Sequence, residues 1–168
     1  SSPSASSFNA MAALEALRAR AIRAFDEEDP RHTLALETLW HCAFPGGEFP
    51  RRFERRSELW GDLGFQGVDP VTDLRGGGFV ALEHLVKFVV SSRGMVAHDP
   101  TFPLAIASIN CTAMLLRHFA LHPTLHLAFP GAAAQPECST AALHHLLELH
   151  HAGTDALQAI HATLLLHL

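Results

Sequence analysis

Apolar residues recur every three or four positions along most of the chain, which is the spacing of one face of an α-helix. The spacing predicts helices over about 11–25, 30–43, 53–63, 79–92, 104–121, 140–149 and 154–165. No window shows the strict alternation of apolar and polar residues that is typical of a half-buried strand. The sequence therefore predicts an all-α fold: a single domain of about six to seven helices around one loop rich in glycine.

Local signals mark several helix ends. Asp29 followed by Pro30 is an N-cap with proline at the first helical position, and Ser139 or Thr140 is suited to cap a later helix. The segment 104–121 is almost continuously apolar and ends before Pro123, so we expect it to be the central, mostly buried helix. The Pro- and Gly-rich segment 130–136 reads as a connector.

The stretch 60–78 interrupts the helical pattern. It contains six glycines, one proline, three carboxylates and a single cation, Arg75. Glycine suits backbone with positive φ or close approach, and Asp-Pro favours an extended or turn conformation, so we expect a loop without helix. Such loops on a rigid scaffold often carry function.

Arg75 is the candidate functional residue of this loop. A guanidinium stays protonated at working pH, and its planar fork of donors matches phosphate oxygens in pairs. Asp73 is near enough in sequence to orient it, although Asp73 is equally suited to cap a helix. An internal salt bridge from Arg75 to Asp69 or Asp73 is the structural alternative. No dinucleotide or P-loop glycine motif is present.

The loop and its flanks resemble the ELMO domain, in the branch of short proteins that activate Arf-like GTPases. The matching residues are Trp60-x-x-x-Gly64-Phe65-Gln66-Gly67-x-Asp69-Pro70-x-Thr72-Asp73-Leu74-Arg75-Gly76-x-Gly78, with further similarity at 29–45 and 102–110. Two positions depart from the family pattern. Leu74 replaces a usual phenylalanine, and 153–156 lack an expected tryptophan, which concerns only the last helix.

The resemblance implies a GTPase-activating protein that supplies Arg75 in trans and turns over no substrate of its own. Its partner would be a GTP-bound Arf-like GTPase that brings its own Mg²⁺, and no cofactor or metal of its own is expected. Residues expected to shape the loop or contact the partner are Trp60, Gly64, Phe65, Gln66, Asp69, Pro70, Asp73, Gly76 and Gly78. The alternative is a non-catalytic adaptor that binds a small GTPase or a Dock-type exchange factor.

Length and composition set the remaining expectations. The chain has 168 residues, enough for one domain over 9–168, with 1–8 expected to be a disordered tail or a vector-derived remnant. Three widely spaced cysteines predict neither a disulfide framework nor a zinc site, which favours a cytoplasmic location. A net charge of −5 argues against nucleic acid binding.

Two biased sets of residues leave alternatives open. The cluster of Arg51, Arg52, Arg55 and Arg56 is either a solvated helix start or a basic rim for an acidic partner or an anionic membrane, which would give peripheral membrane association. The 13 histidines are read as a surface bias, with His118, His122 and His126, or His144, Glu148 and His151, as the metal-binding alternative. Trp40, Trp60 and Phe65 either anchor the loop to the core or contact the partner.

Overall fold

The computed structural model describes residues 5–46, 51–92, 101–123 and 139–168, with side chains from residue 9 onward. Over these ranges the chain forms helices and no strand, which confirms the all-α prediction. The elements are α1 (Ala5–Ala21), α2 (Pro30–Ala43), α3 (Leu59–Asp62), the 3-10 helix η1 (Pro70–Gly76), α4 (Gly78–Ser91), α5 (Leu104–His118), α6 (Thr140–His151) and α7 (Ala156–Leu166).

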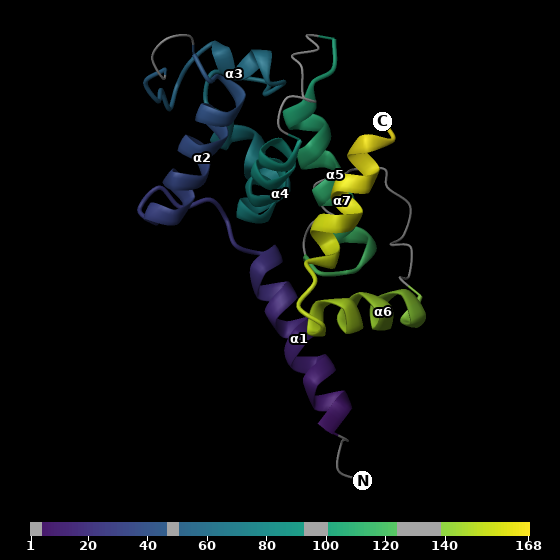
Figure 1. Cartoon of the computed structure of the whole chain (residues 1–168). Coiled ribbons are helices and arrows are strands. Elements are labelled where there is room, and N and C mark those ends of the chain that lie inside the picture. Colours follow the sequence, from purple (N-terminus) through teal and green to yellow (C-terminus); the bar gives the residue numbers. More distant parts are fainter. Residues whose placement is uncertain (1–4, 47–50, 93–100, 124–138) are drawn as a thin grey trace.

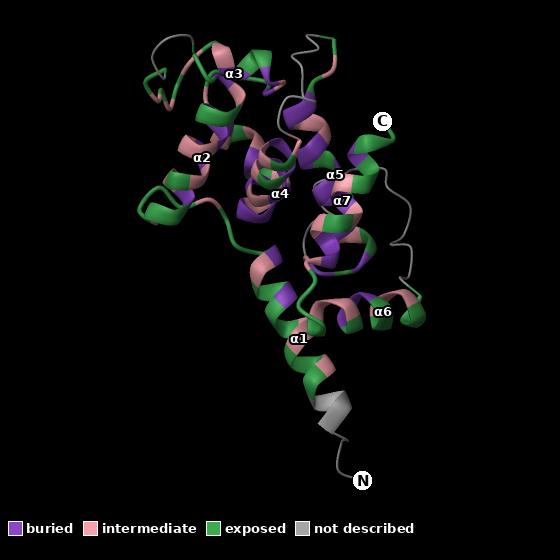
Figure 2. Cartoon of the chain, in the orientation of Figure 1, coloured by how far each residue is buried: buried purple, intermediate pink, exposed green. Residues whose placement is uncertain are grey.

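Helix α4 is the centre of the domain. It packs against α1, α2, α5 and α7, and α6 contacts α1 and α7 (Figure 1). Most of α4 and α5 is buried, whereas residues 9–12 of α1, in the part of the helix that projects from the body, are exposed or half-buried (Figure 2). The element at the centre is therefore the helix that begins at Gly78, the last residue of the glycine-rich stretch.

Two groups of buried apolar side chains form the core. One joins α2, α3, the loop and α4 through an aromatic group that includes Trp40, Trp60 and Phe65. The other joins α1, α6 and the C-terminal half of α5. Removing apolar surface from water contributes about 25 cal/mol per Å² to stability, and this is the main contribution that holds such packed helices together. The candidate loop belongs to the first group.

The predicted helix caps are confirmed. Asp29 accepts a hydrogen bond from the backbone of Arg31 with Pro30 at the first helical position, and Ser139 accepts one from the backbone of Ala142. Other boundaries differ. Helix α5 ends at His118, and Ala120 has a φ of 50°, so the turn begins before Pro123. Helix α1 begins at Ala5, inside the segment predicted to be a tail.

The apolar face predicted for the first helix is only partly correct. Leu17 and Ala21 are buried, but Met11 is 61% exposed and Ile22, which follows the helix, is 54% exposed. The projecting half of α1 has too few neighbours to cover its apolar side chains. The predicted helix also continued to Phe25, whereas residues 22–26 form the segment that leads to α2.

Three histidines contradict the prediction of a purely surface bias. His32, His84 and His161 are at most 1% exposed and lie in the core. Among the described residues no group of histidine, cysteine and carboxylate side chains is arranged to hold a metal ion, and His126 and Cys138 lie outside them. No helix in the described part of the chain is both long enough and apolar enough to cross a bilayer.

Candidate functional site

A short 3-10 helix carries Arg75. Asp69 precedes it with extended backbone, its carboxylate accepts a hydrogen bond from Val71 N at 3.1 Å, and Pro70 occupies the first position. These are the features of a capped helix start, which stabilise this short helix despite the surrounding glycines. The helix predicted to end at residue 63 overlaps the start of this stretch, where residues 60–62 belong to α3. Beyond it, the expectation of a loop without helix is wrong, because the stretch also contains η1 and the first residue of α4.

The upstream end of the loop is attached to the start of α5. The carbonyls of Leu63 and Gly64 accept hydrogen bonds from the backbone of Ala105 and Ile106, at 2.9 and 3.2 Å. These donors belong to the first turn of α5, where backbone N–H groups lack helical partners. Gly64 has a φ of 95°, and a Cβ there would lie 2.4 Å from Pro103 Cα. Only glycine fits this contact.

The downstream end is attached to the segment after α1. Phe79 N donates to Arg23 O at 2.8 Å, and a Cβ on Gly78, whose φ is 61°, would lie 2.6 Å from the same carbonyl. By contrast, a Cβ on Gly76 would meet no described atom within 4 Å. A small group can therefore fit beside Gly76 without meeting a described atom.

Aromatic side chains of the core pack against the loop. Trp40 and Trp60 are fully buried and Phe65 is 5% exposed. The Trp60 ring meets Trp40 and Phe65 edge-on, with centroids 5.1 and 5.5 Å apart, and its indole N–H donates to the carbonyls of Glu54 and Arg55. In this structure all three rings lie in the core, as the anchoring alternative predicts.

Asp73 does not contact Arg75. Its carboxylate accepts a hydrogen bond from Gln66 N at 2.7 Å and so closes the loop on itself. This corrects both the orienting role and the helix-capping role considered for Asp73. The Gln66 side chain is exposed.

Arg75 lies in the last turn of η1 and is exposed. No described residue forms a hydrogen bond or an ion pair with its guanidinium. The expected alternative, a salt bridge to Asp69 or Asp73, is absent within this part of the chain. The guanidinium is free to bind an anion that comes from outside.

Asp69 is paired with two other arginines. Its carboxylate accepts hydrogen bonds from Arg55 Nε at 3.1 Å and from Arg56 Nε at 3.2 Å, and Arg55 also donates to Glu27 at 2.8 Å. Burial opposes ionisation of Asp69, but the bonds from Val71 N and Arg55 outweigh it, so the pKa of Asp69 lies below its ordinary value. The arginine cluster is therefore not a helix start, because α3 begins only at Leu59.

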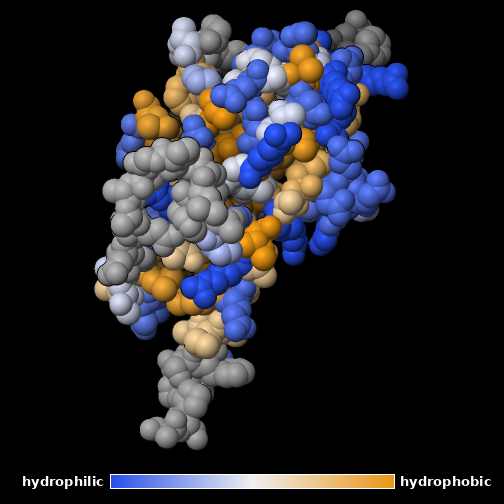
Figure 3. Space-filling model, turned by 180° about the vertical axis from the view of Figure 1, so that it is seen from behind, coloured by the Kyte–Doolittle hydropathy of each residue, from blue (hydrophilic) through white to orange (hydrophobic). Residues whose placement is uncertain are grey.

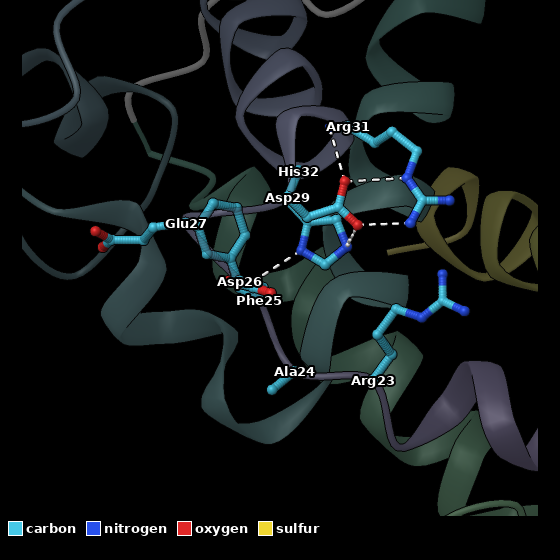
Figure 4. Close-up of a pocket in the computed structure, with 8 residues that line it drawn as sticks. All are labelled: Arg23, Ala24, Phe25, Asp26, Glu27, Asp29, Arg31 and His32. Carbon is cyan, nitrogen blue, oxygen red and sulfur yellow. Dashed lines mark hydrogen bonds and ion pairs between the residues drawn. The ribbon is translucent and has the colours of Figure 1, made fainter.

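A cavity of about 300 Å³ lies beside Arg75. Its described lining includes Glu27, Arg55, Asp69 and Arg75, with Phe25 among the apolar residues. Figure 4 shows the adjoining segment, in which Glu27 points away from the pair formed by Asp29 and Arg31. Hydrophilic side chains gather on the side of α2 and α3 in the view from behind (Figure 3).

The arrangement offers one exposed cation on a fixed, short helix. The two carboxylates that line the cavity with Arg75 are paired with other arginines, so the chemistry that Arg75 itself offers is electrostatic stabilisation of a phosphate-like anion. Arg55, Arg56 and Asp69 are prominent in the sequence, but their pairing is not, and nothing in the sequence singles out Glu27. No local signal could have linked Glu27 to Arg55, since 28 residues separate them.

The fold and the site describe a helical domain that presents an arginine on a capped loop. The profile of the ELMO/CED-12 family matches residues 15–163, so the chain belongs to this family. It is 36% identical over 110 residues to ELMO domain-containing protein B of Dictyostelium discoideum, covering 58% of this chain and 38% of that protein.

Two vertebrate relatives give similar values. Identity to ELMO domain-containing protein 3 of Bos taurus is 34% over 102 residues, covering 55% of this chain and 26% of that protein. Identity to ELMO domain-containing protein 2 of Homo sapiens is 33% over 120 residues, covering 65% of this chain and 40% of that protein. The chain thus spans well under half the length of these relatives. No solved structure matches it with significance.

Proposed function

We propose that this domain is a GTPase-activating protein for an Arf-like small GTPase and that Arg75 acts in trans on the bound GTP. The observation that carries the proposal is that Arg75 is exposed on η1 and is free of hydrogen bonds and ion pairs to described residues. Membership in the ELMO/CED-12 family supports a role in small-GTPase regulation, and the resemblance of residues 60–78 to the activating branch supports this particular role.

In this mechanism the GTPase supplies GTP, Mg²⁺ and the attacking water. Water attacks the γ-phosphorus, and the bond from this phosphorus to the bridging oxygen of the β-phosphate breaks. During this step negative charge is redistributed over the oxygens of the transferred phosphoryl group and the leaving β-phosphate. The Arg75 guanidinium donates hydrogen bonds to these oxygens and stabilises that charge. An arginine supplied in this way accelerates hydrolysis by about 10³ to 10⁵, which is roughly 4 to 7 kcal/mol at the transition state.

The rest of the loop holds the arginine in place. Asp69 caps η1, and Asp73 closes the loop through Gln66 N. The lack of a side chain at Gly64 and Gly78 lets the two ends of the loop pack closely against Pro103 and Arg23. The open space beside Gly76 allows the partner to approach the backbone next to Arg75. A preorganised donor needs little rearrangement when it binds the transition state.

The test is single-turnover GTP hydrolysis by a panel of Arf-like GTPases with the parent domain, Arg75→Ala and Arg75→Lys. We expect both variants to fold and to bind the GTPase but to lose most of the stimulation, because lysine cannot reproduce the paired donors of the fork. Arg52→Lys is the matched control, since Arg52 is an exposed arginine of the neighbouring cluster.

Full stimulation by Arg75→Lys would contradict a role for the guanidinium. Binding without any stimulation by the parent across the panel would point instead to the adaptor function. Binding is measured with GTPases loaded with a non-hydrolysable GTP analogue, so that the two outcomes are separated.

A further inference from the structure

The carboxylates beside Arg75 are already occupied by other arginines. Arg55, Asp69, Glu27 and Arg75 line one cavity. Arg55 joins the two carboxylates, with Nε bonded to Asp69 and Nη2 bonded to Glu27. Arg56 takes the second oxygen of Asp69 through its Nε at 3.2 Å.

The position of Arg55 suits it to this task. Its guanidinium carbon lies 5.6 Å from the centre of the Phe25 ring, and its side chain is 30% exposed against 76% for Arg56. A planar fork can bind two carboxylates at once, whereas an ammonium group acts as a point charge. Stacking on an aromatic ring restrains the fork further.

Arg75 is the exception in this cavity. It shares the cavity with two carboxylates and still forms no ion pair to a described residue. In a 3-10 helix the side chains at positions i and i+3 eclipse, and Asp69, Thr72 and Arg75 accordingly all line this one cavity. An unpaired carboxylate there would attract Arg75 and withdraw it from any ligand.

We infer that Arg55, assisted by Arg56, is a positioning residue that keeps Glu27 and Asp69 occupied so that Arg75 remains unpaired and available to a phosphate-bearing partner. The effect on hydrolysis rests on the proposed function, whereas the availability of the Arg75 guanidinium is a property of this domain alone. The two can therefore be tested separately.

Two other roles for Arg55 predict different behaviour. If Arg55 contacts the partner directly, removing the carboxylates will not compensate for its loss. If Arg55 only stabilises the fold of the loop, Asp69→Asn will reduce the function of the site as much as Arg55→Gln does. If it keeps Arg75 free, removing the carboxylates together with the arginines will restore the site. Asparagine also caps helices, so Asp69→Asn preserves the start of η1.

The test uses four proteins: the parent, the double variant R55Q/R56Q, the quadruple variant E27Q/R55Q/R56Q/D69N, and R52Q as a control that removes one exposed arginine of the same cluster. The first readout is the rate at which phenylglyoxal labels Arg75, followed by peptide mass spectrometry. We expect labelling about fivefold slower in the double variant, the scale of one exposed ion pair, and parent-like rates in the quadruple variant and R52Q.

The second readout is stimulation of GTP hydrolysis with the same proteins. We expect the stimulation to be proportional to the fraction of domains whose Arg75 is unpaired. It should therefore be about fivefold lower in the double variant and return to the parent value in the quadruple variant. Arg55→Lys is a milder probe, because lysine keeps one charge but cannot hold both carboxylates, and its labelling rate should fall between those of the parent and the double variant.

Labelling of Arg75 at the parent rate in both the double variant and Arg55→Lys would overturn the inference. Slow labelling that persists in the quadruple variant would overturn it as well. If labelling follows the expected order but no protein stimulates hydrolysis, the inference stands and the proposed function fails. If Arg75→Lys abolishes stimulation while the double variant keeps it, the proposed function stands and the inference fails.

Discussion

The Arg75 loop and the histidine core between α4, α5 and α7 both contain polar groups without described partners, but in opposite surroundings. In the loop the group is a fully charged guanidinium that is exposed to water. In the core, His84 and His161 are 0% exposed. Each bonds through one ring nitrogen, to Thr112 and Ser108 respectively, and its other nitrogen has no bond to a described residue.

The contrast shows what an unpaired group means in each place. Water solvates an exposed cation, so leaving Arg75 unpaired costs little stability and keeps it available for a ligand. A buried ring nitrogen has no water to replace its partner, so the core favours neutral histidines. The loop is thus suited to binding, whereas the core is sensitive to protonation.

The largest effect on stability is expected at the attachment of the loop. Gly64→Ala would place a Cβ 2.4 Å from Pro103 Cα at a φ of 95°, so we expect a loss of about 2 to 4 kcal/mol in the free energy of unfolding. Urea denaturation measures it. Gly61→Ala is the control, because a Cβ there meets no described atom within 4 Å. Equal losses in the two variants would refute the contact.

The histidine core should respond to pH. Burial, with the charges of His161 and Arg20 adding to it, lowers the pKa of His84 to about 3. The unfolded chain has an ordinary histidine pKa of about 6.5, so it binds more protons between pH 6.5 and 3, and stability falls as pH falls through this window. From His84 alone, we expect the free energy of unfolding to be about 2 kcal/mol lower at pH 5 than at neutral pH.

Denaturation curves at several pH values test this expectation. His84→Gln should flatten the loss between pH 6.5 and 5, although it lowers stability at neutral pH. His144→Gln removes an exposed histidine and is the matched control. An unchanged slope in His84→Gln would show that other groups cause the acid sensitivity. Neither variant should alter labelling of Arg75, since the two regions are separate.

The smallest effect is expected within the loop. Asp73→Ala removes the acceptor of the 2.7 Å hydrogen bond from Gln66 N and should lower the free energy of unfolding by about 1 kcal/mol. Asp73→Asn keeps an acceptor and should cost less. Thermal unfolding followed by circular dichroism measures both. If stability is unchanged and GTPase stimulation disappears, Asp73 acts on the partner and not on the loop.

Much of the fold could be predicted because its signals are local. Asp29 and Ser139 cap helices through bonds to residues two or three positions away, and apolar spacing reports which face of a helix is buried. The sequence also identified Arg75 as the single cation of its loop. These features depend on short segments whose chemistry can be read without knowing their neighbours.

Other features depended on segments that meet only in the folded chain. The 3-10 helix was missed because glycines suggested an irregular loop, whereas the cap at Asp69 and the contacts of Gly64 and Gly78 hold a regular turn. Asp73 was assigned to Arg75 by its nearness in sequence, but the fold placed Gln66 N closer to it. Sequence distance is a poor guide when the backbone turns back on itself.

The amino-acid sequence is enough to predict that the domain is helical, where its capped helices start, and which residue of the loop carries a positive charge. Which charges are paired and which histidines are buried follows only from the folded structure. Arg55 meets Glu27 across 28 residues, and Ser108 meets His161 across 53. The physical reason is that pairing and burial depend on the three-dimensional neighbours of a group, and packing of distant helices creates those neighbours.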